Sequence, residues 1–311
     1  MNCKFIFKNF NTLHCAKRLC SLLVCLIILC TISPFQAFAA VSFKTSSSCP
    51  HKKFIYEYGV FLNVSEDNIS RVKNYHTVVI DAEYFSRSTI KKLKKSGHVV
   101  YTYLNIGSLE DFRKDYNKYK KYCIGKYENW DGEQWVDVSQ AEWQKRIKEL
   151  AHSYYKKGVD GFFIDNCDVY YYMGLNLEGS ESQKVSSQKL FQGLKTILKN
   201  LRTRYNKPVI INGGDTFVSH CIKNNCNLKK YFTAVNQECV YTTIDFDANK
   251  LKRANSDDTK YFESYLRRVK GKGIRVYVLE YSKSKTIAET VRKNCRRNGF
   301  TYYISRSIDL T

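Results

Sequence analysis

The chain has 311 residues, of which 43% are hydrophobic, and it carries a formal net charge of +22. This length is normal for one α/β barrel, and a content of only 3 Pro and 15 Gly excludes a fibrous or disordered chain. The positive charge favours association with an anionic cell envelope, but no nucleic-acid-binding motif is present, so no nucleic-acid partner is expected.

Residues 1–39 have the pattern of a secretory signal peptide. The segment has no acidic residue, an apolar run follows from Leu19 to Ile32, and Ala37-Phe38-Ala39 is a small-x-small cleavage site. The basic residues before and at the start of the run are Lys4, Lys8, Lys17 and Arg18. We expect cleavage near Ala39 and a secreted protein with a net charge of +18 once these four cations are lost. An uncleaved membrane anchor is the alternative, although the run is short for a membrane span.

Residues 40–53 form a short Ser-rich leader, and residues 54–311 alternate between strand-like and helix-like segments. The strand candidates are short and rich in β-branched and aromatic residues. They are Phe54–Phe61, Thr77–Asp81, His98–Asn105, Gly161–Asp165, Pro208–Asn212, Phe232–Asn236, Ile274–Glu280 and Phe300–Ser305.

Helix signals separate these strands. A short helix is expected over Ser88–Ser96, stopped by Gly97, and Ser139 with Glu142 reads as a capping box before a second helix. Further helices are expected from about Ser187, around Phe262–Val269 with Gly271 as the C′ glycine, and before Asn298-Gly299. The long segment Asp111–Trp135 is expected to be an elaborated loop over one end of the sheet.

Eight buried strands alternating with helices predict a single-domain (β/α)8 TIM barrel. A doubly wound open sheet is the main alternative. It would normally carry a Gly-rich phosphate-binding turn after the first strand, and this sequence has none there.

In such a barrel the active site lies at the carboxyl ends of the strands. Six of the eight predicted strand ends carry a carboxylate or carboxamide side chain, and these residues include Asp81, Glu83, Asn105, Asp165, Asp168, Asn212, Asp215, Asn236, Glu238 and Glu280. A polar ring without a Cys or His metal set suits a carbohydrate, because carboxylates supply acid and base while amides bind hydroxyl groups. We expect no metal and no cofactor.

Two carboxylates are the strongest catalytic candidates. Asp165 ends the apolar run Gly161-Phe162-Phe163-Ile164, and Glu238 follows the sixth strand. Either could instead be structural, as a helix cap or a loop anchor. Two carboxylates facing one sugar are the minimum apparatus for glycosidic cleavage.

The chain resembles glycoside hydrolase family 114, the endo-α-1,4-polygalactosaminidases, from about Tyr58 to Ser305. The resemblance rests on Tyr103-Leu104-Asn105-Ile106-Gly107-Ser108 with Glu110 and Arg113, Gly158–Asp165, Asn212-Gly213-Gly214, Asn236-Gln237-Glu238 and Val278-Leu279-Glu280-Tyr281. It implies a retaining mechanism with Asp165 as nucleophile and Glu238 as general acid/base. It also implies that six residues contact the sugar: Tyr103, Asn105, Asp168, Asn212, Glu280 and Tyr281. The strand-end pattern adds Asp81 to these contacts. Tyr281 or Tyr241 could stack on a sugar ring.

Two features do not fit this family simply. A deacetylated galactosamine polymer is cationic, like this chain, so either the cleft is locally acidic or the glycan is N-acetylated or different. Cys167 and Cys239 lie beside the two carboxylates and are expected to be packing residues, since no His accompanies them. Seven cysteines remain after residue 39, and Cys221 and Cys226 are close enough in sequence to pair.

Two other functions remain open from the sequence. One is a non-catalytic secreted carbohydrate-binding barrel associated with the cell envelope. The other is a basic surface protein for anionic polymers, for which the barrel is only a scaffold.

Overall fold

The computed structural model describes residues 54–127, 132–176, 185–246, 248 and 250–311. The predicted signal peptide and the Ser-rich leader therefore lie outside the described residues. No helix in the described part is long and apolar enough to cross a membrane.

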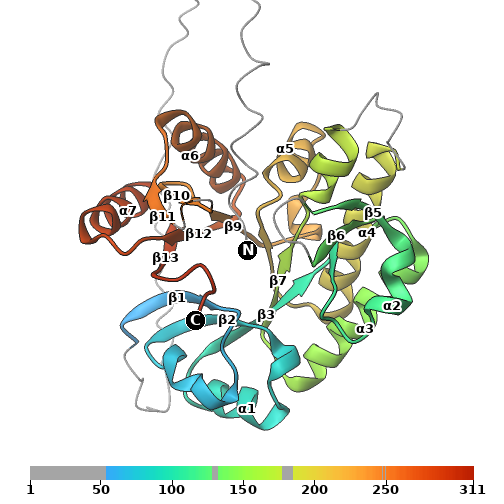
Figure 1. Ribbon diagram of the computed structural model, residues 1–311, viewed down its shortest axis with the longest axis horizontal. Helices are drawn as coiled ribbons and strands as arrows, with labels where there is room; N and C mark the ends of the chain where they lie inside the picture. Colours follow the sequence, from blue (N-terminus) through green and yellow to red (C-terminus); the bar gives the residue numbers. More distant parts are fainter. Residues whose placement is uncertain (1–53, 128–131, 177–184, 247, 249) are drawn as a thin grey trace, which may run out of the picture.

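Eight parallel strands form the centre of the molecule (Figure 1). They are hydrogen-bonded in chain order, with each strand pairing to the next. The first and last strands contact each other, which brings the sheet close to closure as a (β/α)8 barrel. The strands are β1 (Tyr56–Phe61), β2 (Tyr75–Ile80), β3 (Val99–Asn105), β7 (Gly161–Asp165), β8 (Val209–Asn212), β9 (Ala234–Glu238), β12 (Arg275–Tyr281) and β13 (Thr301–Ser305). The predicted fold and all eight predicted strands are confirmed.

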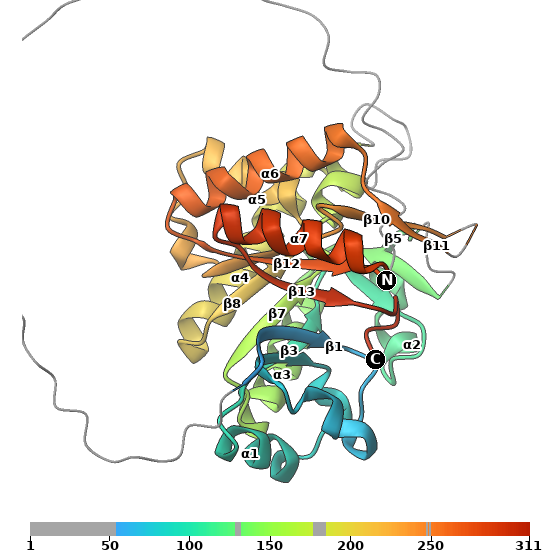
Figure 2. The same ribbon diagram turned by 90° about the vertical axis from the view of Figure 1, so that its left-hand side faces the viewer.

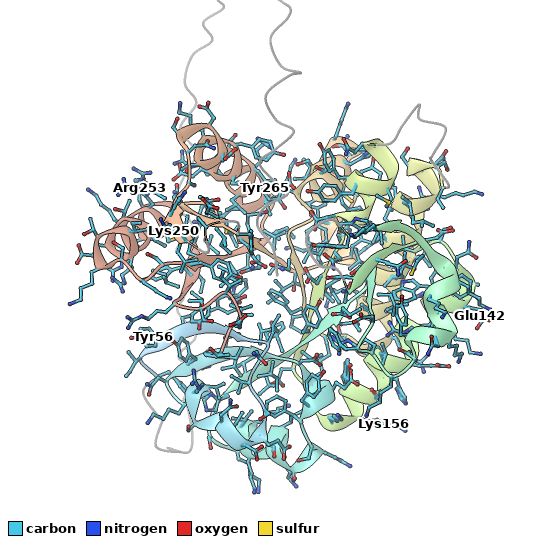
Figure 3. The ribbon with its side chains drawn as sticks, in the orientation of Figure 1. Tyr56, Glu142, Lys156, Lys250, Arg253 and Tyr265 are labelled. Atoms are coloured by element: carbon cyan, nitrogen blue, oxygen red, sulfur yellow. The ribbon has the colours of Figure 1, made fainter. Side chains whose placement is uncertain are left out.

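Helices cover most of the outer face of the barrel. Amphipathic spacing positions them, as in α3, where Trp143, Ile147 and Tyr154 are buried while Glu142 and Lys156 point outward (Figure 3). The helices are η2 (Glu66–Val72), α1 (Arg87–Lys95), α3 (Ala141–Lys157), α4 (Ser187–Tyr205), α5 (Asp215–Lys223), α6 (Ser256–Gly271) and α7 (Lys285–Asn298). Short turns η3 (Ala82–Tyr84), η5 (Tyr170–Leu175) and η6 (Leu228–Lys230) lie between them.

The barrel departs from eight full repeats at one place. A short 3-10 helix, η2, occupies the first crossover, and residues 306–311 after β13 form no helix. Figure 2 faces this side and shows β13 and β1 next to each other with no helix in front of them. Among the described residues, therefore, no helix covers the outside of the seam between the first and last strands.

The predicted loop Asp111–Trp135 contains regular structure. It carries α2 (Tyr116–Tyr119), η4 (Lys120–Tyr122), β5 (Cys123–Lys126) and most of β6 (Glu133–Val136). With β4 (Ser108–Glu110), which directly precedes it, these strands form a three-stranded antiparallel sheet. A second hairpin, β10 (Thr242–Asp245) with β11 (Lys250–Arg253), follows β9. Both additions lie after the carboxyl end of a barrel strand.

Three local predictions were wrong. Ser139 forms no capping box, because its hydroxyl donates to Asp137 (2.6 Å) and Gln140 is the N-cap of α3. Gly271 is the last residue of α6, and the positive φ (+73°) occurs two residues later at Gly273. Cys221 and Cys226 are both free thiols.

One glycine is required by a close backbone approach. A Cβ added to Gly107 would overlap the carbonyl oxygen of Asn166, which belongs to the loop after β7. Gly107→Ala is therefore expected to lower the free energy of unfolding by about 2 kcal/mol or more, as overpacking against backbone does. Urea unfolding followed by circular dichroism measures the change. The matched control is Gly271→Ala, since nothing lies within 4 Å of the Cβ position there; equal losses in both variants would contradict the prediction.

Candidate active site

Asp165 and Glu238 end two strands that flank a third. Asp165 is the last residue of β7 and Glu238 the last of β9, and β8 between them ends at Asn212. Because the three strands are adjacent and parallel, their carboxyl ends meet at one edge of the barrel. The structure thus brings the two sequence-predicted carboxylates together.

The amide of Asn212 bridges the two carboxylates. Its Nδ2 donates to Asp165 Oδ1 at 3.0 Å and to Glu238 Oε1 at 2.8 Å. The two carboxylate oxygens can therefore be no farther apart than about 5.8 Å, the sum of these two distances.

A chain of hydrogen bonds fixes the orientation of this amide. Tyr58 in the barrel interior donates to Asn236 Oδ1 (3.1 Å), and Asn236 Nδ2 donates to Asn212 Oδ1 (2.7 Å). Because the side-chain oxygen of Asn212 accepts this hydrogen bond from Asn236, the two N–H groups of Asn212 must point toward the carboxylates. Tyr281, the last residue of β12, adds a hydrogen bond from its hydroxyl to Glu238 Oε2 at 2.6 Å.

Burial and the neighbouring Glu238 carboxylate raise the pKa of Asp165 to about 7. Hydrogen bonds from Asn212, the Asn166 backbone and Tyr103 act in the opposite direction. Two carboxylates this close do not titrate independently, so the pair retains one proton up to about neutral pH. The raised pKa is that of Asp165, so Asp165 itself is partly protonated near neutral pH in the free protein.

Asp168 and Asp215 extend the acidic character beyond the pair. Burial, followed by the charge of Asp215, raises the pKa of Asp168 to about 8, and burial also raises that of Asp215. Asp168 Oδ1 accepts from the backbone N–H of Gly214 (3.0 Å). Gly213 and Gly214 both have positive φ (+62° and +63°), and a Cβ on Gly213 would press on the Asp168 carboxylate. The double glycine therefore lets the loop after β8 approach Asp168 closely.

The ends of β2 and β3 hold a second polar cluster, centred on Arg113. Its guanidinium pairs with Asp81 (3.0 Å), Glu83 (2.6 Å) and Glu110 (2.9 Å). Tyr103 donates to Glu110 (3.3 Å) and also contacts Asp165, so this cluster adjoins the catalytic candidates. Asp81 is thus an ion-pair partner and caps the turn at Glu83.

Asn105 holds the inserted sheet in place. Its side-chain oxygen accepts from the Gly107 and Ser108 N–H groups, and its Nδ2 donates to Ser108 Oγ (2.7 Å) and Glu133 Oε1 (3.1 Å). Asn166 donates to the same Glu133 oxygen at 2.9 Å. Burial, the Glu110 charge and the Asp165 charge raise the pKa of Glu133 to about 7.

Sequence reasoning missed Glu133, a buried carboxylate close to Asp165. It lies on β6 in the inserted segment, so it has no strand-end position in the barrel pattern. Its only sequence signal was its place in a segment expected to lie over the barrel mouth.

Two predicted sugar contacts have different roles in the structure. Glu280 is fully buried and accepts hydrogen bonds from the N–H groups of Val240, Tyr241 and Thr242 and from the Thr242 hydroxyl. These contacts use all four of its acceptor positions, so Glu280 anchors the loop after β9. Tyr241 is also buried, and its hydroxyl donates to Glu263 on α6 (3.0 Å), away from the strand ends.

The two cysteines beside the carboxylates are not reactive thiols. Cys167 is free and buried, and burial raises the pKa of its thiol well above the usual value. Cys239 is engaged in a disulfide. Among the described residues no group of three or more His, Cys, Asp and Glu side chains is arranged to hold a metal ion.

A parallel α/β barrel with a close carboxylate pair at its strand ends defines a glycosidase-type site. The model of glycoside-hydrolase family GH114 matches residues 38–309, and the chain belongs to this family. The protein is a glycoside hydrolase.

Solved structures share the fold of this chain. The glycoside hydrolase domain of PelA from Pseudomonas aeruginosa is 16% identical with a TM-score of 0.68, covering 82% of this chain and 95% of that one. Aspergillus fumigatus Ega3 in complex with galactosamine is 17% identical with a TM-score of 0.60, covering 86% and 97%. An uncharacterized protein of Methanocaldococcus jannaschii is 21% identical over 84% of this chain and 78% of its own length.

The buried acids of this site are expected to reduce stability at alkaline pH. The folded-state pKa of Asp165, about 7, lies above the unfolded value of about 3.9, so its stabilising contribution is complete below about pH 3.9 and lost as pH rises through 7. Asp165→Asn should raise the free energy of unfolding by about 2 kcal/mol at pH 8 and leave it nearly unchanged at pH 4.

Urea unfolding at both pH values measures this difference. The exposed Asp309→Asn is the matched control and should show little change at either pH. A stabilisation by Asp165→Asn that is the same at pH 4 and pH 8 would exclude the buried charge as its cause.

Proposed function

We propose that this glycoside hydrolase cleaves α-1,4-linked polymers of galactosamine and N-acetylgalactosamine by a two-carboxylate, retaining mechanism. The observation that carries the proposal is the Asp165–Asn212–Glu238 bridge at the ends of β7, β8 and β9. The galactosamine bound by Ega3, a protein of the same fold, supports the choice of sugar.

The spacing of the carboxylates supports the retaining course. Retaining enzymes place the two groups about 5–5.5 Å apart, whereas inverting enzymes need about 6.5–9.5 Å to admit a water molecule. Asn212 holds one oxygen of each carboxylate within about 5.8 Å of the other, a spacing that is compatible with the retaining range.

The two carboxylates would share the reaction as follows. In its ionised form Asp165 attacks the anomeric carbon while Glu238 gives a proton to the leaving oxygen, which breaks the glycosidic bond and forms a glycosyl ester on Asp165. Glu238, now ionised, takes a proton from water, which attacks the anomeric carbon and releases Asp165. The Tyr281 hydroxyl at 2.6 Å holds Glu238 in place through both steps.

The acidity of the site supports a cationic sugar. Asp168 places a further carboxyl group near Asp165, Asp215 adds another near Asp168, and Glu133 approaches Asp165 from the inserted sheet. A sugar ammonium group brought into this environment would be stabilised by Coulomb attraction, and would lower the pKa values of the same acids. The basic charge of the chain as a whole therefore does not oppose a cationic substrate.

Tyr103, Asp168, Asn212 and Tyr281 are the sequence-predicted residues that remain candidates for direct sugar contact. Each is at or next to the Asp165–Glu238 pair. Asp81 and Asn105 would act on the site indirectly. Asp81 would hold Arg113 in place, and Asn105 would hold the inserted sheet. Secretion through the residue 1–39 signal peptide is part of the same proposal, since the substrate is a polysaccharide.

Asp165→Asn and Glu238→Gln should each reduce cleavage at least 1,000-fold, because each removes one of the two groups that make and break bonds. The assay is release of new reducing ends from partially deacetylated α-1,4-galactosaminogalactan by the mature protein. Glu142→Gln, on the exposed face of α3, is the control and should retain activity.

The outcomes separate the alternatives. Full activity in either catalytic variant would overturn the assignment of that residue. Binding of the polymer by the unmodified protein without any reducing-end release would point to a non-catalytic binder instead.

Binding of galactosamine at pH 6.5 should release protons. The acids at the site have raised pKa values (about 7 for Asp165 and about 8 for Asp168), so they hold protons that an arriving ammonium group displaces. Isothermal titration calorimetry in two buffers of different ionisation enthalpy measures the number released. N-acetylgalactosamine, which is neutral, should release none, and Asp168→Asn should reduce the release by galactosamine; equal release by both sugars would contradict an ammonium-binding site.

A further inference from the structure

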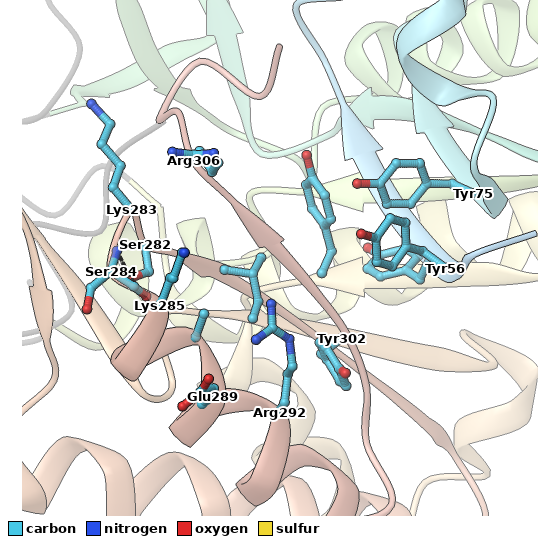
Figure 4. A pocket seen from close by; sticks show the side chains of 14 residues that line it. Tyr56, Tyr75, Ser282, Lys283, Ser284, Lys285, Glu289, Arg292, Tyr302 and Arg306 are labelled. Carbon is cyan, nitrogen blue, oxygen red and sulfur yellow. Dashed lines mark hydrogen bonds between the residues drawn. The ribbon is translucent and has the colours of Figure 1, made fainter.

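A cavity lies on the outside of the barrel, at the seam between β1 and β13. It has a volume of about 540 Å³ and is bounded by the start of β1 and β2 on one side and by α7 and β13 on the other (Figure 4). No helix of the described residues lies over the junction of β13 with β1 at this place. Neither Asp165 nor Glu238 lines it; Tyr58, which donates to Asn236, is among its lining residues.

Tyrosines form one wall of this groove, which we call the seam groove. Tyr56 and Tyr75 lie side by side with ring centroids 4.9 Å apart and planes 27° from parallel. Tyr56 is 52% exposed, so part of its ring is accessible to a ligand. Tyr302 of β13 lies farther along the same groove (Figure 4). Exposed, flat rings of this kind are suited to stack against the apolar face of a sugar.

Cations line the opposite wall. Lys283, Lys285, Arg292 and Arg306 all border the seam groove, against a single acid, Glu289. All four cations are exposed, and none takes part in an ion pair within the described residues. Figure 4 shows them on the side of the groove away from Tyr56 and Tyr75.

These four cations do not stabilise the fold through ion pairs within the described residues. Arg113 and Arg146, which do support the structure, are paired with carboxylates at 2.6–3.0 Å. Lys283 and Lys285 instead flank the N-terminus of α7, where the helix dipole already contributes positive charge and a cation is mildly unfavourable. An anion in the groove would be favoured by both the side chains and the helix end.

The groove has the dimensions of a polymer site. It extends from Tyr56 and Tyr75 at the start of the strands to Lys283 and Arg306 beyond their ends. A strand of the length of β1, six residues, spans about 20 Å. Several sugar units in a row could therefore contact both the tyrosines and the cations.

We propose that the seam groove is a second carbohydrate-binding site, specific for an acidic polysaccharide that carries carboxylate groups along its chain. The tyrosines stack on its rings, and the lysines and arginines bind its carboxylates. The protein then has two sites of opposite charge: an acidic one at the strand ends and a basic one on the barrel wall. This proposal does not rest on the proposed reaction, because its test measures binding to the seam groove and not cleavage of a glycan.

The test measures binding of a linear oligogalacturonate to the mature protein by calorimetry or fluorescence anisotropy at physiological ionic strength. The triple variant Lys283→Gln/Lys285→Gln/Arg292→Gln should weaken binding at least tenfold. Its matched control, Arg87→Gln/Lys91→Gln/Lys95→Gln, removes the same charge from the exposed face of α1 and should change the affinity less than twofold. Equal losses in both variants would overturn the proposal in favour of non-specific charge attraction.

A second pair of variants tests the aromatic wall. Tyr56→Ala should weaken oligogalacturonate binding at least threefold, whereas Tyr155→Ala, which removes another exposed tyrosine, should not. Circular dichroism and unchanged reducing-end release confirm that the groove variants are folded.

Two further ligands exclude other classes of partner. A single-stranded oligodeoxynucleotide of equal charge, and vesicles containing anionic lipid, should bind more weakly and be insensitive to Tyr56→Ala. If either binds the groove as tightly as the oligogalacturonate and with the same dependence on the variants, the groove is not a carbohydrate site.

Discussion

The active site depends on the orientation of one amide. Asn212 can donate to Asp165 and Glu238 at once only because its oxygen is engaged by Asn236, which is engaged in turn by Tyr58. This chain runs from the barrel interior to the strand ends across β1, β9 and β8. The closed barrel thereby sets the separation of two carboxylates that lie 73 residues apart in the sequence.

Keeping these acids buried costs stability. Burial raises the pKa values of Asp165, Asp168, Glu133 and Glu280, and only Glu280 has all its acceptor positions filled by backbone and hydroxyl donors. The first three retain protons that an incoming cation could displace. Glu280 instead fixes the loop that follows Glu238. Similar shifts in pKa thus accompany a binding role in one case and a structural role in the other.

The distribution of charge is as important as its sum. A net charge of +22 suggests a protein for anionic partners, yet the strand ends concentrate carboxyl groups, and their one buried guanidinium, Arg113, is fully paired. The basic residues lie on the helices and around the seam groove. Because Coulomb interactions between exposed charges are screened beyond about 8 Å at physiological salt, the two regions can act on ligands of opposite sign.

The sequence by itself determined the barrel, its eight strands and the carboxylates at their ends, because strand periodicity and strand-end positions are local properties. It could not separate Glu280 and Tyr241 from the residues at the carboxylate pair, since all of them lie at or just after strand ends. It also gave no reason to choose Glu133. Only the tertiary structure decided these roles, because the partner of each side chain comes from a different repeat of the barrel: Glu280 meets the loop after β9, and Glu133 meets Asn105 and Asn166. The same holds for the seam groove, which arises where the first and last strands meet.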